Sequence, residues 1–372
     1  MNNSQSKRVV FIDWLRALAI FLVVIYHLVE SFWYHHQSIV SEIGIKPLTS
    51  LLLNTSSDLF LDSNINLGFV GVAIFLLISG FIIPLTIKKK CIKEFAIIRF
   101  FRIYPTYFVS LIMVLLLLVL QEYFQGSNYI FNNDRLLSNV FLFQDWTYQY
   151  LYDTAHWLLL IIIKWYFLAA LIHYFKAWHN YFFILVTAIL ITIAASLANY
   201  YLPNFKNASF YGFFLTIAYS GQYLVFILLG VCFYNLFINN WTTKVFFLVF
   251  GLLYLIFIIS TIYGYSFYED LNFLSYSIGL FIYIVFFLFR NRFILFRIIS
   301  FFSNISYSWY LTHRVGGYLM LYYLSSIGFG QYLSIGLVFA VSIIVAYIIH
   351  KTIEVPTYIY GRKLARRFTR SQ

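Results

Sequence analysis

Three ionisable residues lie inside the first long apolar segment of the chain, where a charge is costly. Asp13, Arg16 and His27 occur within residues 9–29, among mostly apolar neighbours. An ionisable group at membrane depth is expensive unless it is paired or hydrated, so each one needs a reason. An imidazole can act as a base near neutral pH, and a guanidinium can hold an anion. This segment therefore contains candidates for acid–base chemistry.

The spacing of Arg16 and His27 fits a shared helix face. They are eleven residues apart, which is about 20° beyond three full turns and about 16 Å along a helix axis. Such a helix places a cation near one leaflet and an imidazole near the other, along a path across the membrane. The alternative is structural, with a buried histidine bonded to a neighbouring helix and an arginine reaching the interface. The two residues alone leave both interpretations open.

A second candidate is the pair Arg99 and Arg102, just before an apolar segment at 103–120. The i, i+3 spacing predicts two guanidiniums on one side of a helix start. Planar, permanently charged forks suit phosphate groups. The alternative is a positive anchor that faces lipid headgroups, which four preceding lysines favour (Lys88, Lys89, Lys90 and Lys93).

The remaining charged residues in or beside apolar segments are His313, Arg314, Lys164 and Glu354. A His–Arg dipeptide inside a span is unusual, although neighbours in sequence point about 100° apart on a helix. Lys164 can pair with an acid or extend to the interface. Glu354 is expected to mark the inner end of the last apolar segment, because Pro356 follows it.

The apolar segments that contain these charged residues indicate a membrane protein. The chain has 372 residues, 62% hydrophobic and 10% charged, against about 25% charged in a soluble domain. We predict an all-α, polytopic fold of about ten transmembrane helices, forming a single domain over 1–372 with a core at about 9–353 and a basic tail at 354–372. The predicted spans are 9–29, 67–87, 103–120, 157–175, 181–201, 211–237, 245–263, 271–289, 303–325 and 333–353.

The distribution of charge predicts the orientation. With both termini in the cytoplasm, nineteen of the 25 lysines and arginines fall on the cytoplasmic side. Only Lys46, Arg135 and Lys206 fall in outer loops, which is a strong positive-inside bias. The net charge of +12 thus reflects topology and an anionic inner leaflet, and nucleic acid need not be invoked. Cys91 and Cys232 have no metal-ligand spacing, and no metal is expected.

Taken together, the motifs resemble the membrane acyltransferase 3 family of bacterial O-acyltransferases. Arg16 and His27 match its arginine and histidine separated by ten residues, within a first segment that begins DWLRA. The other matching segments are GVAIFLLISGF at 71–81, RFFR at 99–102, ISYSWYLTH at 305–313 and EVP at 354–356. Each motif is common alone, whereas five in order over nearly the whole chain are specific.

One segment departs from the family pattern. Many relatives carry a glutamate in the fourth span, five residues after a tryptophan. Here WLLLIIIKWY at 157–166 keeps Trp157 but has Ile162 at the acidic position, and His156 precedes the tryptophan, as in a subset of relatives. Any mechanism that requires this glutamate therefore does not transfer to this chain.

The resemblance implies transfer of an acyl group, most often acetyl, from cytoplasmic acyl-CoA to a hydroxyl on the far side of the bacterial inner membrane. The expected acceptor is a cell-envelope glycan or a lipid-linked saccharide. Arg99 and Arg102 are expected to bind the phosphates of acetyl-CoA. The expected catalytic residues are His27, Arg16 and His313, with His27 as base or acyl carrier.

The same resemblance suggests how the acceptor and the oxyanion are held. We expect contacts with the acceptor from Tyr310, Arg314, Trp157 and His156. Stabilisation of the developing oxyanion can come from His313, Arg314 or Tyr310. Membrane lipid is the surrounding partner.

Two other functions remain open from the residues alone. A transporter or exporter can use Arg16, His27 and His313 as a proton or anion path. The chain shows no internal repeat and no paired, interrupted helices, which weighs against transport. A membrane anchor for partner enzymes leaves the buried charges without a purpose.

The charge pattern gives a testable topology. Cysteines introduced into residues 30–66 and 121–156 should react with a membrane-impermeant thiol reagent in intact cells, and the region 88–99 should react only after permeabilisation. Reaction of 88–99 in intact cells would contradict the predicted orientation.

Overall fold

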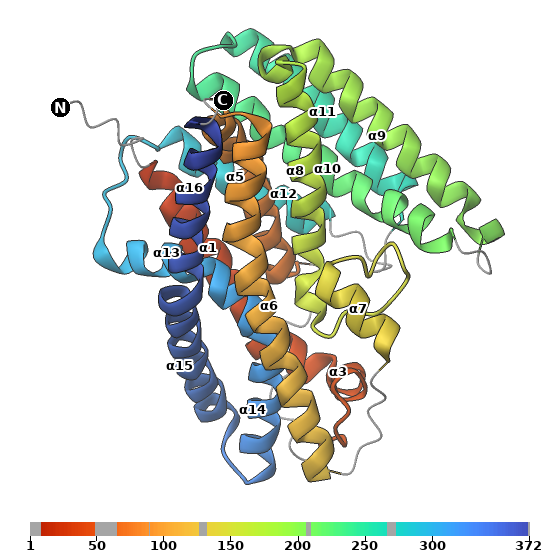
Figure 1. Cartoon of the computed structure of the whole chain (residues 1–372), viewed down its shortest axis with the longest axis vertical. Coiled ribbons are helices and arrows are strands. Elements are labelled where there is room, and N and C mark those ends of the chain that lie inside the picture. Colours follow the sequence, from red (N-terminus) through yellow and green to blue (C-terminus); the bar gives the residue numbers. More distant parts are fainter. Residues whose placement is uncertain are drawn as a thin grey trace.

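The computed structural model describes residues 9–48, 65–88, 90–125, 132–205, 210–265 and 273–370. Within these ranges the chain is helical and contains no strand, which confirms the all-α class (Figure 1). Several residues used in the sequence argument lie outside them, among them Lys89, Lys206 and much of the predicted outer loop at 30–66.

Eight helices in the described ranges are long and apolar enough to cross a membrane. The first joins α1 (Val10–Ile25), the π-helical turn η1 (Tyr26–Ser31) and α2 (Phe32–Tyr34), and the last joins α15 (Gln331–Ile349), η5 (His350–Glu354) and α16 (Val355–Arg370). The others contain α5 (Leu67–Ile87), α6 (Ile92–Gln125), α8 (Trp157–Tyr174), α9 (Tyr181–Tyr201), α10 (Tyr211–Phe237) and α11 (Thr243–Tyr263).

The two remaining predicted spans also fall on helices, but on shorter ones. The segment predicted at 271–289 contains α12 (Phe273–Leu288). The segment predicted at 303–325 is broken at His313 into α13 (Arg297–Thr312) and α14 (Arg314–Ser326). The short helices α3 (His36–Ile43) and α7 (Asn133–Phe141) lie between spans.

Two predicted boundaries are wrong. Helix α6 begins at Ile92 and continues through Pro105, so Arg99 and Arg102 lie two to three turns inside it and not at its start. The chain also stays helical beyond Glu354, since Pro356 lies just after the π-helical turn η5 inside one continuous helix. The predicted tail is thus largely helix α16, which packs on α6 where Gly361 meets the ring of Phe101.

Helices α5 and α10 form the centre of the bundle. Of their most apolar stretches, 72% and 78% are buried, against 28% for α9 and α11, whose outer faces are left for lipid. The two central helices cross at Gly80 and Gly230, where a Cβ on Gly80 would lie 2.0 Å from the Ile227 carbonyl oxygen. Glycine is therefore required for this close approach.

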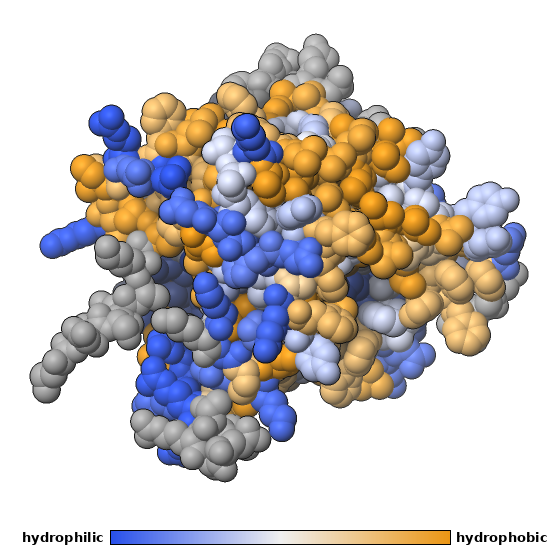
Figure 2. Space-filling view, turned by 90° about the horizontal axis from the view of Figure 1, so that it is seen from above, coloured by the Kyte–Doolittle hydropathy of each residue, from blue (hydrophilic) through white to orange (hydrophobic). Residues whose placement is uncertain are grey.

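The start of α1 and the end of α16 lie at the same end of the bundle, with the connection between α5 and α6 (Figure 1). Seen from above this end, hydrophilic residues gather over one part of the surface and hydrophobic ones cover most of the rest (Figure 2). Cys91 is exposed in the α5–α6 connection and offers a native reporter for the topology experiment.

The crossing of the central helices can be tested with one added methyl group. Gly80→Ala should destabilise the protein by about 1–3 kcal/mol or more, because the methyl meets backbone atoms that cannot rotate away. Gly251→Ala in α11 is the matched control, since a Cβ there meets nothing within 4 Å. Thermal unfolding in detergent should show a lower midpoint for Gly80→Ala only. Equal midpoints for the two variants would contradict the described crossing.

Candidate active site

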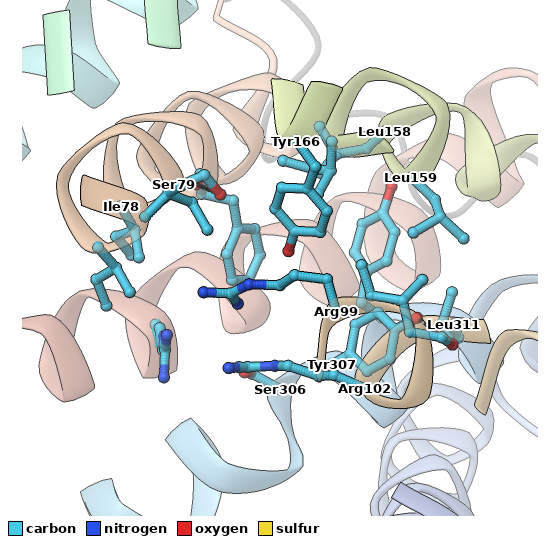
Figure 3. Close-up of a pocket in the computed structure, with 17 residues that line it drawn as sticks. Ile78, Ser79, Arg99, Arg102, Leu158, Leu159, Tyr166, Ser306, Tyr307 and Leu311 are labelled. Atoms are coloured by element: carbon cyan, nitrogen blue, oxygen red, sulfur yellow. Dashed lines mark hydrogen bonds between the residues drawn. The ribbon is translucent and has the colours of Figure 1, made fainter. Parts of the chain in front are cut away.

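A cavity of about 140 Å³ lies between α1, α5, α6, α8 and α13, and three arginines line it. Arg16 comes from α1, and Arg99 and Arg102 come from α6. Figure 3 shows the two α6 arginines extending side by side into the cavity, with Tyr166 and Ser79 nearby. None of the lining residues is acidic. The cavity is therefore suited to an anion.

Arg99 is held inside the bundle and does not face lipid. Its side chain is 8% exposed, and its Nη2 donates to Thr86 Oγ1 at 2.7 Å. Its guanidinium carbon lies 5.3 Å from the ring centre of Phe95 and 5.2 Å from that of Tyr166. Its Nε is buried without a hydrogen-bond partner in the described part of the chain. The anchor alternative thus does not describe Arg99, which keeps a donor without a protein acceptor.

Arg102 and Arg16 are less buried than Arg99. The guanidinium carbon of Arg102 lies 5.8 Å from the ring centre of Tyr358, so α16 forms part of its surroundings. Arg16 shares its helix with Asp13, whose Oδ1 accepts a 2.8 Å hydrogen bond from Ser303. The predicted donor residues and the predicted catalytic arginine therefore meet in one cavity.

The rest of the cavity wall is mainly apolar. Ile162, which occupies the position of the family glutamate, is one of the lining residues, so this departure makes the wall apolar at that point. Tyr310 and Leu311 of α13 also line the cavity, and the Tyr310 ring centre lies 6.1 Å from that of His313. The cavity therefore adjoins the break between α13 and α14.

His27 and His313 meet at this break, with ring centres 5.1 Å apart. His27 lies in the π-helical turn η1 and is partly exposed, whereas His313 is fully buried. Irregular turns in otherwise regular helices recur at functional sites. The structure therefore brings together the two histidines that the sequence proposed as catalytic, 286 positions apart in numbering.

The surroundings of His313 determine which ring nitrogen carries its proton. Nδ1 lies 3.1 Å from the Trp309 carbonyl oxygen and 3.0 Å from the Tyr310 carbonyl oxygen. Carbonyl oxygens only accept, so the proton belongs on Nδ1. Nε2 of neutral His313 is then a bare acceptor, and it is buried without a hydrogen-bond partner among the described residues. Only protonated His313 could donate from Nε2 to an oxyanion.

The other two expected oxyanion donors already have partners. Arg314 Nη1 and Nη2 donate to the two carboxylate oxygens of Glu42 at 2.8 and 2.7 Å, and Nη1 lies 3.5 Å from Asp153 Oδ1. The Tyr310 hydroxyl donates to the Ala155 carbonyl oxygen. In this arrangement both side chains hold segments between the spans, among them α3, against α13 and α14.

His156 and Trp157 occupy different surroundings. His156 is fully buried, and its Nε2 lies 3.2 Å from the carbonyl oxygen of Leu311, a cavity residue. Trp157 is half-buried, with its ring centre 5.1 Å from that of Tyr223 and 6.0 Å from that of Tyr219. His156 thus supports the site from behind, while Trp157 belongs to an aromatic cluster beside it.

The structure shows the partners of Lys164, which the sequence left open, and of Glu354. Lys164 forms an ion pair with Asp145 and donates to Ser220 Oγ at 2.9 Å. Glu354 accepts hydrogen bonds from Ser308 Oγ at 2.7 Å and from His350 at 2.9 Å. No group of three or more potential metal ligands occurs in the ranges that the structure describes.

Sequence reasoning missed Tyr318, Glu42 and Asp153. The Tyr318 hydroxyl lies 2.9 Å from His27 Nδ1, and the two acids pair with Arg314. Both acids lie in the segments predicted as outer loops, 30–66 and 121–156, and nothing local indicated that these segments fold back onto the bundle. Tyr318 is one of 33 tyrosines and carried no signal of its own.

The fold and site together define a polytopic membrane protein with an arginine-lined cavity beside the pair His27 and His313. The family model described as "Acyltransferase domain" matches residues 9–351, nearly the whole chain. The chain therefore belongs to the membrane acyltransferase 3 family, as the motifs indicated, and is a membrane acyltransferase. No curated protein and no solved structure matches it.

Proposed function

We propose that this enzyme transfers acetyl from cytoplasmic acetyl-CoA to a hydroxyl of a cell-envelope glycan or a lipid-linked saccharide, in the inner membrane of a bacterium. The observation that carries the proposal is that the arginine-lined cavity lies next to the histidine pair. A cavity with three arginines and no acid adjoins, through Tyr310, the pair His27 and His313. Family membership supports this enzyme over the transporter and anchor alternatives.

The cavity suits the donor. Its guanidiniums can take the phosphates of CoA, whose charge would otherwise be costly beside an apolar wall. Apolar residues between the arginines and Tyr310, such as Leu159 and Ile162, suit the uncharged arm that carries the thioester. The acetyl group would then arrive beside the histidines while the phosphates stay near Arg99 and Arg102.

His27 is the proposed base or acyl carrier. As a base, it removes the proton of the acceptor hydroxyl while the oxygen attacks the thioester carbonyl; the C–S bond breaks, and the proton passes to the departing thiolate. As a carrier, its nitrogen attacks the thioester carbonyl and the C–S bond breaks, so an acyl-histidine forms and CoA leaves as the thiolate. The acceptor hydroxyl then attacks the acyl-histidine, the imidazole is released, and the hydroxyl proton passes to the thiolate. Its partial exposure favours contact with a substrate, and His313 is close enough to share the proton.

The acceptor is proposed to approach past Trp157. Its half-buried ring, with Tyr219 and Tyr223, offers the flat apolar surface on which a sugar ring can stack. Arg314 and His156 would support this side indirectly, since their described contacts are with Glu42, Asp153 and the Leu311 carbonyl. Arg16 would stabilise charge at the donor end.

The donor site predicts a loss of affinity on removal of a guanidinium. Arg99→Ala and Arg102→Ala should each weaken acetyl-CoA binding about ten- to a hundredfold, because a charge-assisted phosphate contact contributes about 1.5–3 kcal/mol. Lysine at either position should restore only part of the lost affinity for acetyl-CoA. Arg292→Ala, at an exposed position, is the control. The affinity for acetyl-CoA is measured by calorimetry. An unchanged affinity in folded Arg99→Ala and Arg102→Ala variants would contradict the proposed donor site.

The catalytic assignment predicts that His27→Ala and His27→Gln both lose at least about a hundredfold in transfer, since a general base contributes 10²–10⁴-fold. Both variants should still bind acetyl-CoA. The measurement is incorporation of labelled acetyl into membrane glycan, normalised to folded protein, with the exposed His35→Gln as control. A purely structural histidine predicts that glutamine is tolerated. Activity of His27→Gln within severalfold of wild type would overturn the assignment.

A further inference from the structure

We propose that Tyr318 is a positioning residue that, together with Ser31, fixes the tautomer of His27 and leaves Nε2 free as the proton acceptor. This inference rests on the proposed function of His27. Tyr318 lies in α14 and is fully buried, and its hydroxyl is 2.9 Å from His27 Nδ1 and 3.1 Å from Ser31 Oγ. Ser31 is the last residue of the π-helical turn that contains His27.

The direction of the hydrogen bonds follows from the count of protons. The Tyr318 hydroxyl has one proton, and it is donated to Ser31 Oγ. Its oxygen can then only accept from His27, so Nδ1 of His27 must carry the imidazole proton. Neutral His27 therefore presents an unprotonated Nε2. A histidine base needs this arrangement, in which the second nitrogen is held by a fixed partner.

The ring of Tyr318 is itself held by charged neighbours. The Arg314 guanidinium carbon lies 5.0 Å from the ring centre, and the bidentate pair with Glu42 keeps that guanidinium in place. The ring of Phe32 lies 5.6 Å away on another element. An aromatic ring confined in this way keeps its hydroxyl at a fixed point, and this hydroxyl orients His27. Arg314 therefore acts on His27 through Tyr318, without contacting the substrate.

The arrangement indicates a structural role for Arg314 that the sequence did not suggest, namely to hold the ring of Tyr318 in place. Its two terminal nitrogens are engaged by Glu42, and its face is covered by Tyr318. We therefore assign it to the support of Tyr318. The chain of contacts runs from Glu42 through Arg314 and Tyr318 to His27.

The test compares two tyrosines of the same helix. Tyr318→Phe removes the hydroxyl at His27, and Tyr323→Phe removes one that donates to Gln121, away from the site. We expect kcat of Tyr318→Phe to fall at least about tenfold, with KM for acetyl-CoA unchanged, because a lost hydrogen bond of about 1.4 kcal/mol corresponds to tenfold in rate. Tyr323→Phe should keep the wild-type kcat. Equal kcat values for the two variants would overturn the inference.

A second variant keeps the test valid if Tyr318→Phe does not fold. Ser31→Ala leaves every ring in place but removes the acceptor, so the Tyr318 hydroxyl becomes free to donate to Nδ1 and to favour the wrong tautomer. We expect a severalfold lower kcat with unchanged KM. A wild-type kcat in Ser31→Ala would overturn the inference. If the His27 variants lose transfer but Tyr318→Phe and Ser31→Ala keep the wild-type kcat, only the positioning role of Tyr318 is refuted. If the His27 variants keep wild-type transfer, the proposed catalytic role of His27 is refuted.

Discussion

The cost of a charge at membrane depth is the constraint on which this structure depends. Most of the buried charges are paired or hydrogen-bonded within the protein: Arg314 with Glu42 and Asp153, Lys164 with Asp145, and Glu354 with Ser308. The contact between Arg314 and Glu42 joins elements 272 positions apart in the chain, and that between Ser308 and Glu354 joins elements 46 positions apart, so both fix distant segments relative to each other. The arginine-lined cavity is different, because Arg16, Arg99 and Arg102 converge there and no acidic side chain lines it. A concentration of positive charge in such a place is best explained by a bound anion.

Helix α13 makes polar side-chain contacts with several different parts of the bundle. Successive side chains reach different neighbours: Ser303 bonds to Asp13 of α1, Tyr307 to the Ile103 carbonyl of α6, and Ser308 to Glu354 of η5. Trp309 donates to Ser342 of α15 and Tyr310 to the Ala155 carbonyl. The segment resembling the late family motif is therefore a junction of the bundle as well as a wall of the cavity. The helix then breaks at His313, where catalysis is proposed.

The sequence predicted the helical segments well, because an apolar stretch of about 20 residues is a direct physical requirement of the bilayer. It also identified His27, His313 and the three arginines, because ionisable residues stand out against apolar neighbours. It did not predict the break at His313, since a helix interrupted inside a protein bundle leaves no gap in hydrophobicity. Nor could it pair Glu42 with Arg314, 272 positions away. Such pairing depends on how the segments between the spans fold back onto the bundle, which the local sequence pattern does not encode.

The proposed reaction requires one ligand to reach from the arginine cavity to the histidine pair. Cryo-electron microscopy of the enzyme bound to a non-hydrolysable acetyl-CoA analogue tests this most directly. We expect phosphate density against Arg99 and Arg102, with the acetyl group next to His27 and His313. Density with the acetyl group directed away from the histidines, or with the phosphates bound elsewhere on the protein, would contradict it.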